Sequence, residues 1–498
     1  MTIHEPLEPS PPSLRGSSPV SPDEGELAIR GGAIRVVGYL SGVLISLGAA
    51  TVLVRHLGIS DFGRYVTVIS LIALVGGVTE AGIVVYGIRE FSVRTDADRR
   101  RLMADLLGMR LTLTLAGIVV AVCFGLLVGY GGVLVLGSVF AGIGLLVQVV
   151  ADVLSIPLQA KLQLGRLTLV DFTRRLLMLV LIGALAAAGA GLLPFLAVSV
   201  LAGAGALALL APMVRSLMTI GASFEWRRWR ALFAETLPFA VAVSIGAVYF
   251  YVTIIVMSLI ASAVQTGLFA TSFRVTQAAL AVPALALTAI FPLITRVHGD
   301  DDPEIGKRLG KVFDVAVIFG VWMSLAMALG APFIIDVIAG HRAHGAISVL
   351  RIQGLVLTAS FISASSMFGL LAIRRYRPML IASSSALILN IVLGLILVPA
   401  LGARGGAIAD VATEALVATG LTLVFVQSLP RHSVASSVLP PVVLAAAIAA
   451  AAWLLPIGSV PRVLLATVIY FAILLLTGTM PDEVTNATRR LRTSRALS

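Results

Sequence analysis

Long runs of apolar residues, separated by short polar gaps, fill the chain from about residue 36 to residue 476. A run of about 20 apolar residues lets an α-helix cross the hydrocarbon core of a bilayer. Fourteen such runs are present, and no strand-like alternation suggests a transmembrane barrel. They cover residues 36–54, 65–86, 111–130, 133–158, 169–188, 192–213, 237–259, 267–294, 312–338, 347–371, 379–398, 406–426, 438–455 and 460–476. The pattern predicts an all-α polytopic membrane protein with about 14 transmembrane helices.

The composition of the 498 residues narrows the function classes. Hydrophobic residues make up 58% of the chain and charged residues only 12%, whereas a soluble domain has about 25% charged residues. A soluble enzyme is therefore excluded. The single cysteine, Cys123, cannot form an internal disulfide, and the six histidines show no spacing typical of a metal site. We expect no metal centre and no cofactor.

The distribution of positive charge predicts the orientation in the membrane. Of the 36 Lys and Arg residues, 28 lie in the N-terminal segment and in every second gap thereafter. Only five lie in the alternating gaps, and three lie in or beside apolar runs. Cytoplasmic loops carry such an excess of Lys and Arg, so both termini are expected in the cytoplasm of a protein of the cell membrane. The net charge of +11 then needs no nucleic acid to explain it.

Two weak internal similarities indicate a duplication. Residues 61–67 (Asp-Phe-Gly-Arg-Tyr-Val-Thr) and 265–271 (Gln-Thr-Gly-Leu-Phe-Ala-Thr) share Gly, an aromatic residue and Thr at an offset of 204. Residues 160–166 and 372–378 both combine a small residue with a basic loop, at an offset of 212. Both offsets correspond to six apolar runs. A repeat of six helices in one orientation predicts two lobes around an axis along the membrane normal.

The repeat and the changes in composition predict six parts of the chain. These are a disordered cytoplasmic segment (1–30), an N-lobe (31–215), a cytoplasmic linker (216–236), a C-lobe (237–428), two appended helices (429–478) and a basic cytoplasmic tail (479–498). Two-lobed repeats of this kind are typical of transporters that work by alternating access. No GxxxxGK[ST] sequence is present, so the chain has no P-loop ATPase of its own.

Several stretches resemble a known family in order and spacing. They are 53–65 (Leu-Val-Arg-His-Leu-Gly-Ile-Ser-Asp-Phe-Gly-Arg-Tyr), 267–274, 290–296 and 401–409 (Leu-Gly-Ala-Arg-Gly-Gly-Ala-Ile-Ala). Over about residues 32 to 430 the chain resembles the polysaccharide transporter family. Its members are the oligosaccharide flippases of the multidrug/oligosaccharidyl-lipid/polysaccharide (MOP) exporter superfamily.

The resemblance implies a function in the biosynthesis of cell-surface polysaccharide. The protein would move a polyprenyl-phosphate-linked oligosaccharide across the cytoplasmic membrane by alternating access. Its contacts would be this lipid-linked substrate and membrane lipids, and its partners a polysaccharide polymerase and glycosyltransferases. Two alternatives stay open. One is a multidrug or small-solute antiporter of the same superfamily, which should have an acid-lined cavity. The other is a membrane enzyme acting on a polyprenyl-linked sugar, but no catalytic constellation on a long outer loop is visible, so we expect no enzyme.

Arginines are the expected phosphate ligands, because the guanidinium donates two parallel charge-assisted hydrogen bonds. Arg274 lies about seven residues into the eighth run, where a charge costs a few kcal/mol unless it is paired or hydrated. It also matches an arginine of the family motif. Arg35, Arg55 and Arg64, at the ends of the first two runs, are further candidates for substrate binding, with anchoring to lipid headgroups as the alternative.

A second group predicts coupling to an ion gradient. Asp410 and Glu414 are four residues apart and share one face of the twelfth helix. Asn390 lies near the middle of the eleventh run, so the three could bind Na⁺ or take up a proton. Alternatively, Glu414 neutralises Arg274. The family often has an acid or amide in the seventh helix where this chain has Thr253, which carries no charge.

Overall fold

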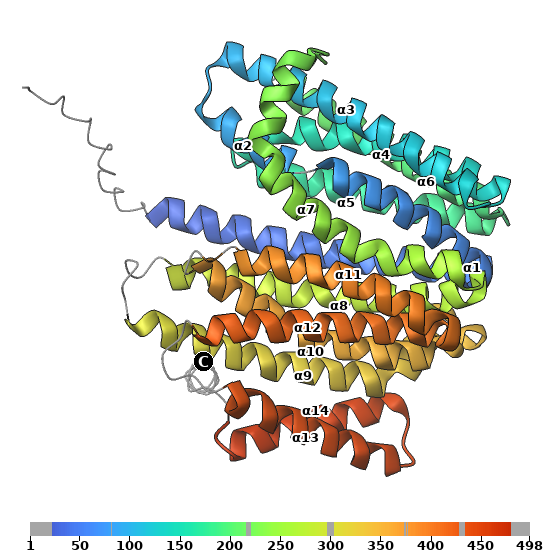
Figure 1. The fold of residues 1–498 in the computed structure, drawn as a ribbon, viewed down its shortest axis with the longest axis vertical. Coiled ribbons are helices and arrows are strands. Elements are labelled where there is room, and N and C mark those ends of the chain that lie inside the picture. The colour runs from blue at the N-terminus through green and yellow to red at the C-terminus, as the bar shows by residue number, and fades with distance from the viewer. Residues whose placement is uncertain are drawn as a thin grey trace, which may run out of the picture.

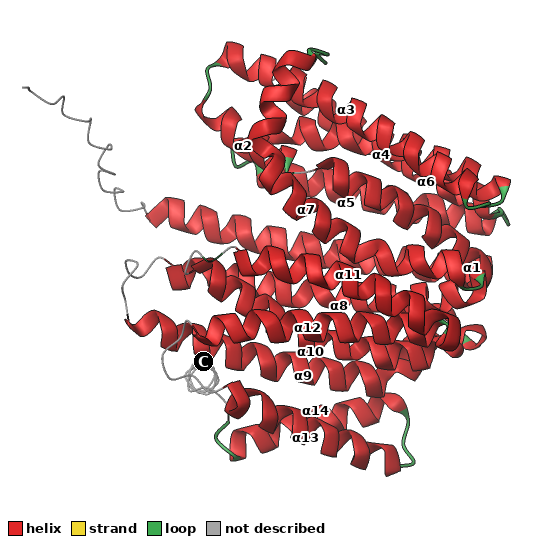
Figure 2. Cartoon of the chain, viewed as in Figure 1, coloured by secondary structure: helices red, strands yellow, loops and turns green. Residues whose placement is uncertain are grey.

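A computed structural model describes residues 22–80, 82–215, 221–295, 303–372, 375, 377–427 and 434–479. Within these ranges the secondary structure is helical and contains no strand (Figure 2). The first half of the chain forms α1 (Pro22–Glu80), α2 (Ile83–Val93), α3 (Asp96–Leu127), α4 (Gly132–Ala160), α5 (Leu164–Ala187) and α6 (Leu192–Arg215). The second half forms α7 (Trp226–Ile260), α8 (Ala263–Thr295), α9 (Pro303–Ala339), η1 (His341–Ala343), α10 (Gly345–Ala372), α11 (Arg377–Leu401), α12 (Ala403–Gln427), α13 (Val434–Leu454) and α14 (Ser459–Leu476).

The first predicted membrane pass lies in α1, and the second begins in α1 and ends in α2. Gly58 interrupts this helix with φ 75° and ψ 171°, values that an L-residue with a side chain rarely adopts. Figure 1 shows the chain turning back at this break, so the two halves of α1 run in opposite directions. Each of the other predicted runs begins in its own helix from α3 to α14.

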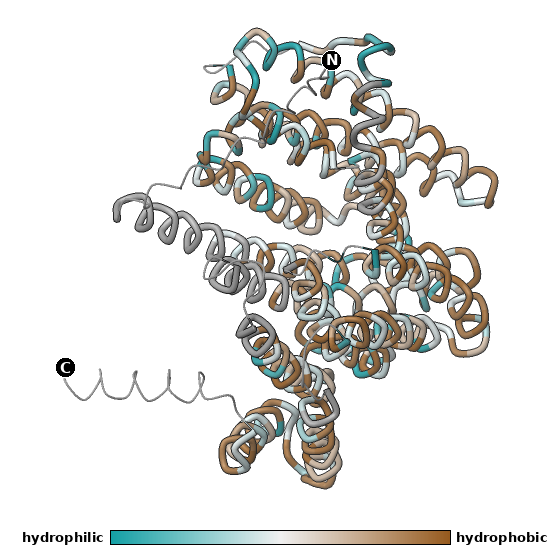
Figure 3. Tube along the Cα trace, turned by 60° about the vertical axis from the view of Figure 1, so that its left-hand side comes forward, coloured by the Kyte–Doolittle hydropathy of each residue, from teal (hydrophilic) through white to brown (hydrophobic). Residues whose placement is uncertain are grey.

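The surface supports a multi-pass membrane protein. Ten stretches of the described residues are long and apolar enough to cross a membrane, and one of them, Leu40–Val93, runs across the break in α1 and on through α2. Large apolar side chains such as Leu44, Val120 and Ile381 are 70%, 68% and 69% exposed. Hydrophobic residues, in brown, recur along much of the coloured tube in Figure 3. Such a surface is unfavourable in water and suits contact with lipid tails. The predicted polytopic all-α fold is therefore confirmed.

The helices form two lobes and an appended hairpin (Figure 1). We refer to α1–α6 as the N-lobe and to α7–α12 as the C-lobe. In the N-lobe, α4 packs on α6 and α1 packs on α5. In the C-lobe, α10 packs on α9 and on α12. Between the lobes, α1 packs against α7 and α8. The hairpin of α13 and α14 packs on α9.

The two ends of the bundle differ, and we name them for this difference. The short-loop end holds the break in α1 and the turns α3–α4, α5–α6, α7–α8, α9–α10 and α11–α12. Glycines with positive φ lie at five of these turns, namely Gly58, Gly129, Gly189, Gly340 and Gly402. They end helices in the left-handed conformation that favours glycine. The opposite end, which we call the basic end, holds α2 and the loop after α6.

Two predicted boundaries differ from the helices observed. α1 begins at Pro22, so the last residues of the segment expected to be disordered are helical. Good helix formers such as Glu24, Leu27 and Ala28 explain this. Residues 1–21 and 480–498 lie outside the described residues, as does part of the predicted linker. From Trp226 onward that linker belongs to α7.

α7 joins the two lobes as one continuous helix of 35 residues. Near its start, Trp229 is buried in an apolar cluster with Ile83 of α2 and Leu102 of α3. Near its end, Val256 lies against Gly394 of α11. The helix is therefore packed against the N-lobe at the basic end and against the C-lobe toward the short-loop end.

Candidate functional site

A cavity of about 400 Å³ lies where the two lobes meet. Its walls come from both halves of α1, from α5 and from α8. Most of the lining is apolar, contributed by residues such as Leu53, Phe62 and Met178. Two cations, Arg175 and Arg274, interrupt this apolar lining. The cavity therefore offers positive charge inside an otherwise apolar wall.

Arg274 lies eleven residues into α8, about 16 Å along the helix from its start at the short-loop end. It is partly buried, and its Nη1 donates a hydrogen bond of 3.2 Å to Oε1 of Gln277, one turn further along. No carboxylate forms an ion pair with it among the described residues. A guanidinium carries five N–H donors, so most of the capacity of Arg274 is available to an anion in the cavity.

Arg175 lines the same cavity as Arg274. The sequence did not indicate this residue as a binding candidate. The fifth apolar run begins only at residue 169, which places this arginine near the edge of the run. In fact α5 begins at Leu164, and Arg175 lies eleven residues, or about 16 Å, inside the helix. Its Nη1 donates hydrogen bonds of 3.1 Å to the carbonyl oxygen of Gly42 and to Oγ of Ser46.

Gly42 of α1 leaves room for the side chain of Arg175. A Cβ atom at Gly42 would lie 2.9 Å from Cδ and 3.0 Å from Nε of Arg175. The arginine can cross α1 here only because Gly42 has no side chain. Gly38 and Gly42 lie one turn apart in the first apolar run. Such a pair of small residues indicates that another helix approaches closely, and it is the signal from which this contact could have been predicted.

Arg55 and Arg64, two of the other predicted arginines, are not part of the described lining of this cavity. The side chain of Arg35 lies outside the described residues. Arg55 lies near the break in α1, where its Nη2 donates to the carbonyl oxygens of Asp336 at 3.2 Å and Val337 at 2.6 Å. Arg64 forms an exposed ion pair of 3.1 Å with Asp61. The prediction that Arg55 and Arg64 bind substrate therefore gains no support from their positions.

The predicted coupling residues do come together, inside the C-lobe. The carboxylate oxygen Oδ1 of Asp410 accepts hydrogen bonds from Nδ2 of Asn390 at 3.1 Å and from Oγ1 of Thr253 at 2.6 Å. Oγ1 of Thr253 also lies 2.9 Å from Oδ1 of Asn390. The other carboxylate oxygen of Asp410 lies 3.5 Å from Nε2 of Gln353. We call these four residues, contributed by α7, α10, α11 and α12, the Asp410 cluster.

The Asp410 cluster is rich in buried oxygen atoms. Thr253, Gln353 and Asn390 are 4%, 1% and 1% exposed. Oε1 of Gln353 is buried without a hydrogen-bond partner among the described residues. A buried acceptor without a donor is unfavourable. Carboxylate, amide and hydroxyl oxygens are also the groups that bind hard cations.

Glu414 lies one turn beyond Asp410 on α12. Its two carboxylate oxygens accept hydrogen bonds from the hydroxyls of Tyr249 at 2.9 Å and Ser363 at 2.7 Å. In the part of the chain that the structure describes, Glu414 forms no ion pair with Arg274. The alternative in which it neutralises that arginine is therefore not what the structure shows.

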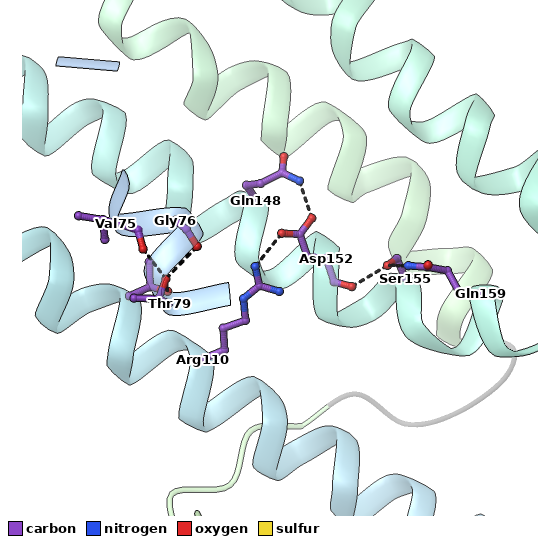
Figure 4. Close-up of polar contacts among 9 residues, drawn as sticks. Val75, Gly76, Thr79, Arg110, Gln148, Asp152, Ser155 and Gln159 are labelled. Atoms are coloured by element: carbon purple, nitrogen blue, oxygen red, sulfur yellow. Dashed lines mark hydrogen bonds and ion pairs between the residues drawn. The ribbon is translucent and has the colours of Figure 1, made fainter. Parts of the chain in front are cut away.

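A third polar group lies inside the N-lobe (Figure 4). Arg110 of α3 is 2% exposed, and its Nη2 pairs with Oδ2 of Asp152 of α4 at 3.1 Å. Oδ1 of Asp152 accepts a hydrogen bond of 2.6 Å from Gln148. These residues hold two helices of one lobe together and do not line the cavity with Arg274.

Comparison with known proteins identifies the fold. A family model described as polysaccharide biosynthesis protein matches residues 28–298. No curated protein matches the chain. The lipid II flippase MurJ, in an inward closed conformation, is 11% identical with a TM-score of 0.73, over 88% of this chain and 98% of that chain. An inward-facing multidrug resistance MATE family transporter of the MOP superfamily is 15% identical with a TM-score of 0.60, over 78% and 94%.

A MOP superfamily transporter from Pyrococcus furiosus, reported to have a binding pocket of reversed polarity, is 16% identical with a TM-score of 0.53, over 80% and 94% of the two chains. At such low identity these likenesses establish the fold alone. They confirm the predicted two-lobed MOP architecture. Since the family model covers more than half of its residues, the chain belongs to the polysaccharide biosynthesis protein family and has the fold of MOP superfamily flippases and transporters.

Proposed function

We propose that the protein is a flippase that moves a polyprenyl-phosphate-linked oligosaccharide across the cell membrane by alternating access. The observation that carries this proposal is the pair Arg175 and Arg274, which face one cavity of about 400 Å³ between the lobes. Such a substrate has an anionic phosphate that apolar surroundings do not solvate. Two guanidinium groups in an apolar wall supply the charge and the paired donors that a phosphate needs.

The sign of the cavity charge distinguishes this function from its nearest alternative. An exporter of cationic drugs needs acidic groups in its cavity, since opposite charges attract strongly where water is scarce. The carboxylates of Asp410 and Glu414 lie in the C-lobe and are absent from the described lining of the cavity. The two arginines in the cavity therefore favour an anionic lipid-linked substrate.

We place the basic end in the cytoplasm and the short-loop end outside. The excess of Lys and Arg in the loops of the basic end supports this orientation. The substrate would then enter from the cytoplasmic leaflet and leave through an opening at the short-loop end. At that end the two lobes are in contact through the bonds that Arg55 donates to α9.

The Asp410 cluster is proposed as the site where an ion gradient is coupled to this motion. Its oxygens could bind Na⁺, or Asp410 could take up a proton. The Thr253 hydroxyl stands where the family often has an acid or amide, and it contacts both Asp410 and Asn390. Thr253 therefore completes the cluster without adding a charge.

The export of lipid-linked oligosaccharide tests the function. In cells without the chromosomal gene, Arg274→Ala should reduce surface polysaccharide about 10- to 100-fold, the loss expected for a charge-assisted hydrogen bond. Mass spectrometry should show the lipid-linked intermediate accumulating. Arg274→Lys should rescue export in part, because an ammonium group lacks the bidentate fork. Arg64→Ala, which removes an exposed arginine outside the cavity, is the matched control. Full export by Arg274→Ala at normal abundance would rule the proposal out.

A further inference from the structure

Three possible metal ligands meet at the short-loop end, in the turn between α9 and α10. Asp336 lies in the last turn of α9, His341 begins η1, and His344 follows it directly. Nε2 of His344 lies 2.8 Å from Oδ1 of Asp336 and 3.1 Å from Nδ1 of His341. Nδ1 of His341 lies 3.6 Å from the same oxygen of Asp336. One atom from each residue thus forms a small triangle.

The local backbone explains why these side chains converge. Gly340 has φ 69° and reverses the chain after α9. The next three residues form a 3₁₀ turn, in which side chains three residues apart are eclipsed. His341 and His344 are three apart and therefore project to one side, with ring centroids 5.0 Å apart. The reversal at Gly340 brings Asp336 to that same side.

The dimensions of the triangle match a tetrahedral metal site. Zn²⁺ binds imidazole nitrogen at about 2.0–2.1 Å and carboxylate oxygen at about 2.0–2.2 Å. In a tetrahedron of these bond lengths, neighbouring ligand atoms are separated by about 3.3–3.5 Å. The observed separations of 2.8, 3.1 and 3.6 Å bracket this range. A shift of a few tenths of an ångström would seat an ion against all three atoms.

The donor set and the surroundings also suit a transition metal. Two imidazoles and one carboxylate are a ligand set that Zn²⁺ uses with water in the fourth position, and all three side chains are exposed to solvent. The neighbouring cations are Arg342, within the turn, and Arg55. Arg55 donates to the backbone carbonyl oxygen of Asp336 and not to its carboxylate.

We propose that Asp336, His341 and His344 bind a divalent transition-metal ion such as Zn²⁺ at the short-loop end of the molecule. The histidine spacing alone gave no sign of such a site in the sequence, because Asp336 approaches only through the reversal at Gly340. The site does not depend on which substrate the transporter carries. It is separate from the Arg274 cavity and from the Asp410 cluster.

Metal titration tests the proposal. Full-length protein purified in detergent, with any affinity tag removed and treated with a chelator, is titrated with Zn²⁺ by calorimetry and with Co²⁺ by its visible absorption. The wild type should bind one ion saturably, and Co²⁺ should give the intense bands of tetrahedral coordination. His341→Ala and His344→Ala should each weaken binding at least about 10- to 100-fold, and the double variant should abolish it.

Arg342→Ala is the matched control, because it alters the same turn but keeps every ligand. It should bind Zn²⁺ at least as tightly as the wild type, since it removes a nearby positive charge. Zn²⁺ should also raise the thermal unfolding temperature of the wild type but not of the double histidine variant, which separates loss of the site from loss of the fold. Absence of a saturable site in the wild type, or equal binding by the double variant, would overturn the proposal.

Discussion

Gly63 of α1 and Gly267 of α8 touch through their backbones, one from each lobe. A Cβ atom at Gly63 would lie 2.7 Å from the backbone nitrogen of Gly267 and 3.1 Å from its Cα. The two glycines occupy matching positions in the predicted internal repeat, at an offset of 204 residues. A residue that touches its own counterpart lies close to the axis that relates the two copies. The contact therefore supports two lobes related by a two-fold axis.

A side chain at this contact should open the short-loop end. Gly63→Ala and Gly267→Ala each place a methyl group against opposing backbone, which cannot move aside as a flexible side chain could. We expect both variants to populate the state that is open at this end. A cysteine introduced at Ala278, in a Cys123→Ala background, should then react faster with a membrane-impermeant thiol reagent added outside.

Gly191→Ala is the control for this measurement. Gly191 lies in a turn at the same end, and a Cβ there would meet nothing within 4 Å. Its labelling rate should equal that of the parent. Unchanged labelling of both Gly63→Ala and Gly267→Ala would show that the glycine contact does not hold this end closed.

The second cavity arginine gives a prediction that sequence reasoning alone could not have made. Arg175→Ala should lower export about 10- to 100-fold with little change in abundance. If both arginines bind one phosphate, the double variant with Arg274→Ala should lose much less than the product of the two single losses. Arg166→Ala, at the exposed start of the same helix, should export normally. Additive losses in the double variant would separate Arg175 from the site of Arg274.

Coupling can be tested at the Asp410 cluster. Asp410→Asn and Thr253→Val should each weaken the dependence of transport on the Na⁺ or proton gradient, because each removes an oxygen ligand or its hydrogen bond. Transport into vesicles with and without each gradient measures this dependence. Thr419→Val alters an exposed position of α12, the helix that contains Asp410. This variant should leave the gradient dependence unchanged. Coupling that is intact in both cluster variants would assign the cluster a structural role instead.

The Arg110–Asp152 pair should contribute to stability rather than to transport chemistry. Asp152→Ala leaves the buried guanidinium of Arg110 without its partner, which should cost about 3 kcal/mol of unfolding free energy. Replacing both residues with Leu should recover part of this loss. Asp96→Ala breaks the exposed pair with Arg99 and should cost less than about 1 kcal/mol. Thermal unfolding in detergent compares the stability of these three variants. A loss of stability in Asp152→Ala no larger than that in Asp96→Ala would contradict the expectation.

The membrane passes could be predicted from the sequence because the bilayer fixes both their length and their composition. Helix ends were harder, since helices continue into water where charged residues are tolerated. α3 begins at Asp96, well before the apolar run that starts at residue 111. For the same reason the depth of Arg175 could not be predicted, because its helix begins five residues before the apolar run.

The candidate sites were predictable to the extent that they depend on one helix. The spacing of Asp410 and Glu414 and the depth of Asn390 placed these residues correctly in one region. Their partners Thr253 and Gln353 lie on other helices and required the tertiary structure. For Arg55 the sequence left substrate binding and headgroup anchoring open, because an apolar helix has no polar face that indicates the direction of a side chain. The structure directs it toward α9 instead.

The continuous α7 has a mechanical consequence for a molecule whose lobes rotate against each other. Since Trp229 is fixed in the N-lobe and Thr253 in the C-lobe, every rotation must bend or twist the helix between them. The elastic stiffness of this helix then enters the free-energy difference between the two access states. Its far end carries a member of the Asp410 cluster, so elastic strain in α7 and the affinity of that cluster for an ion are expected to change together.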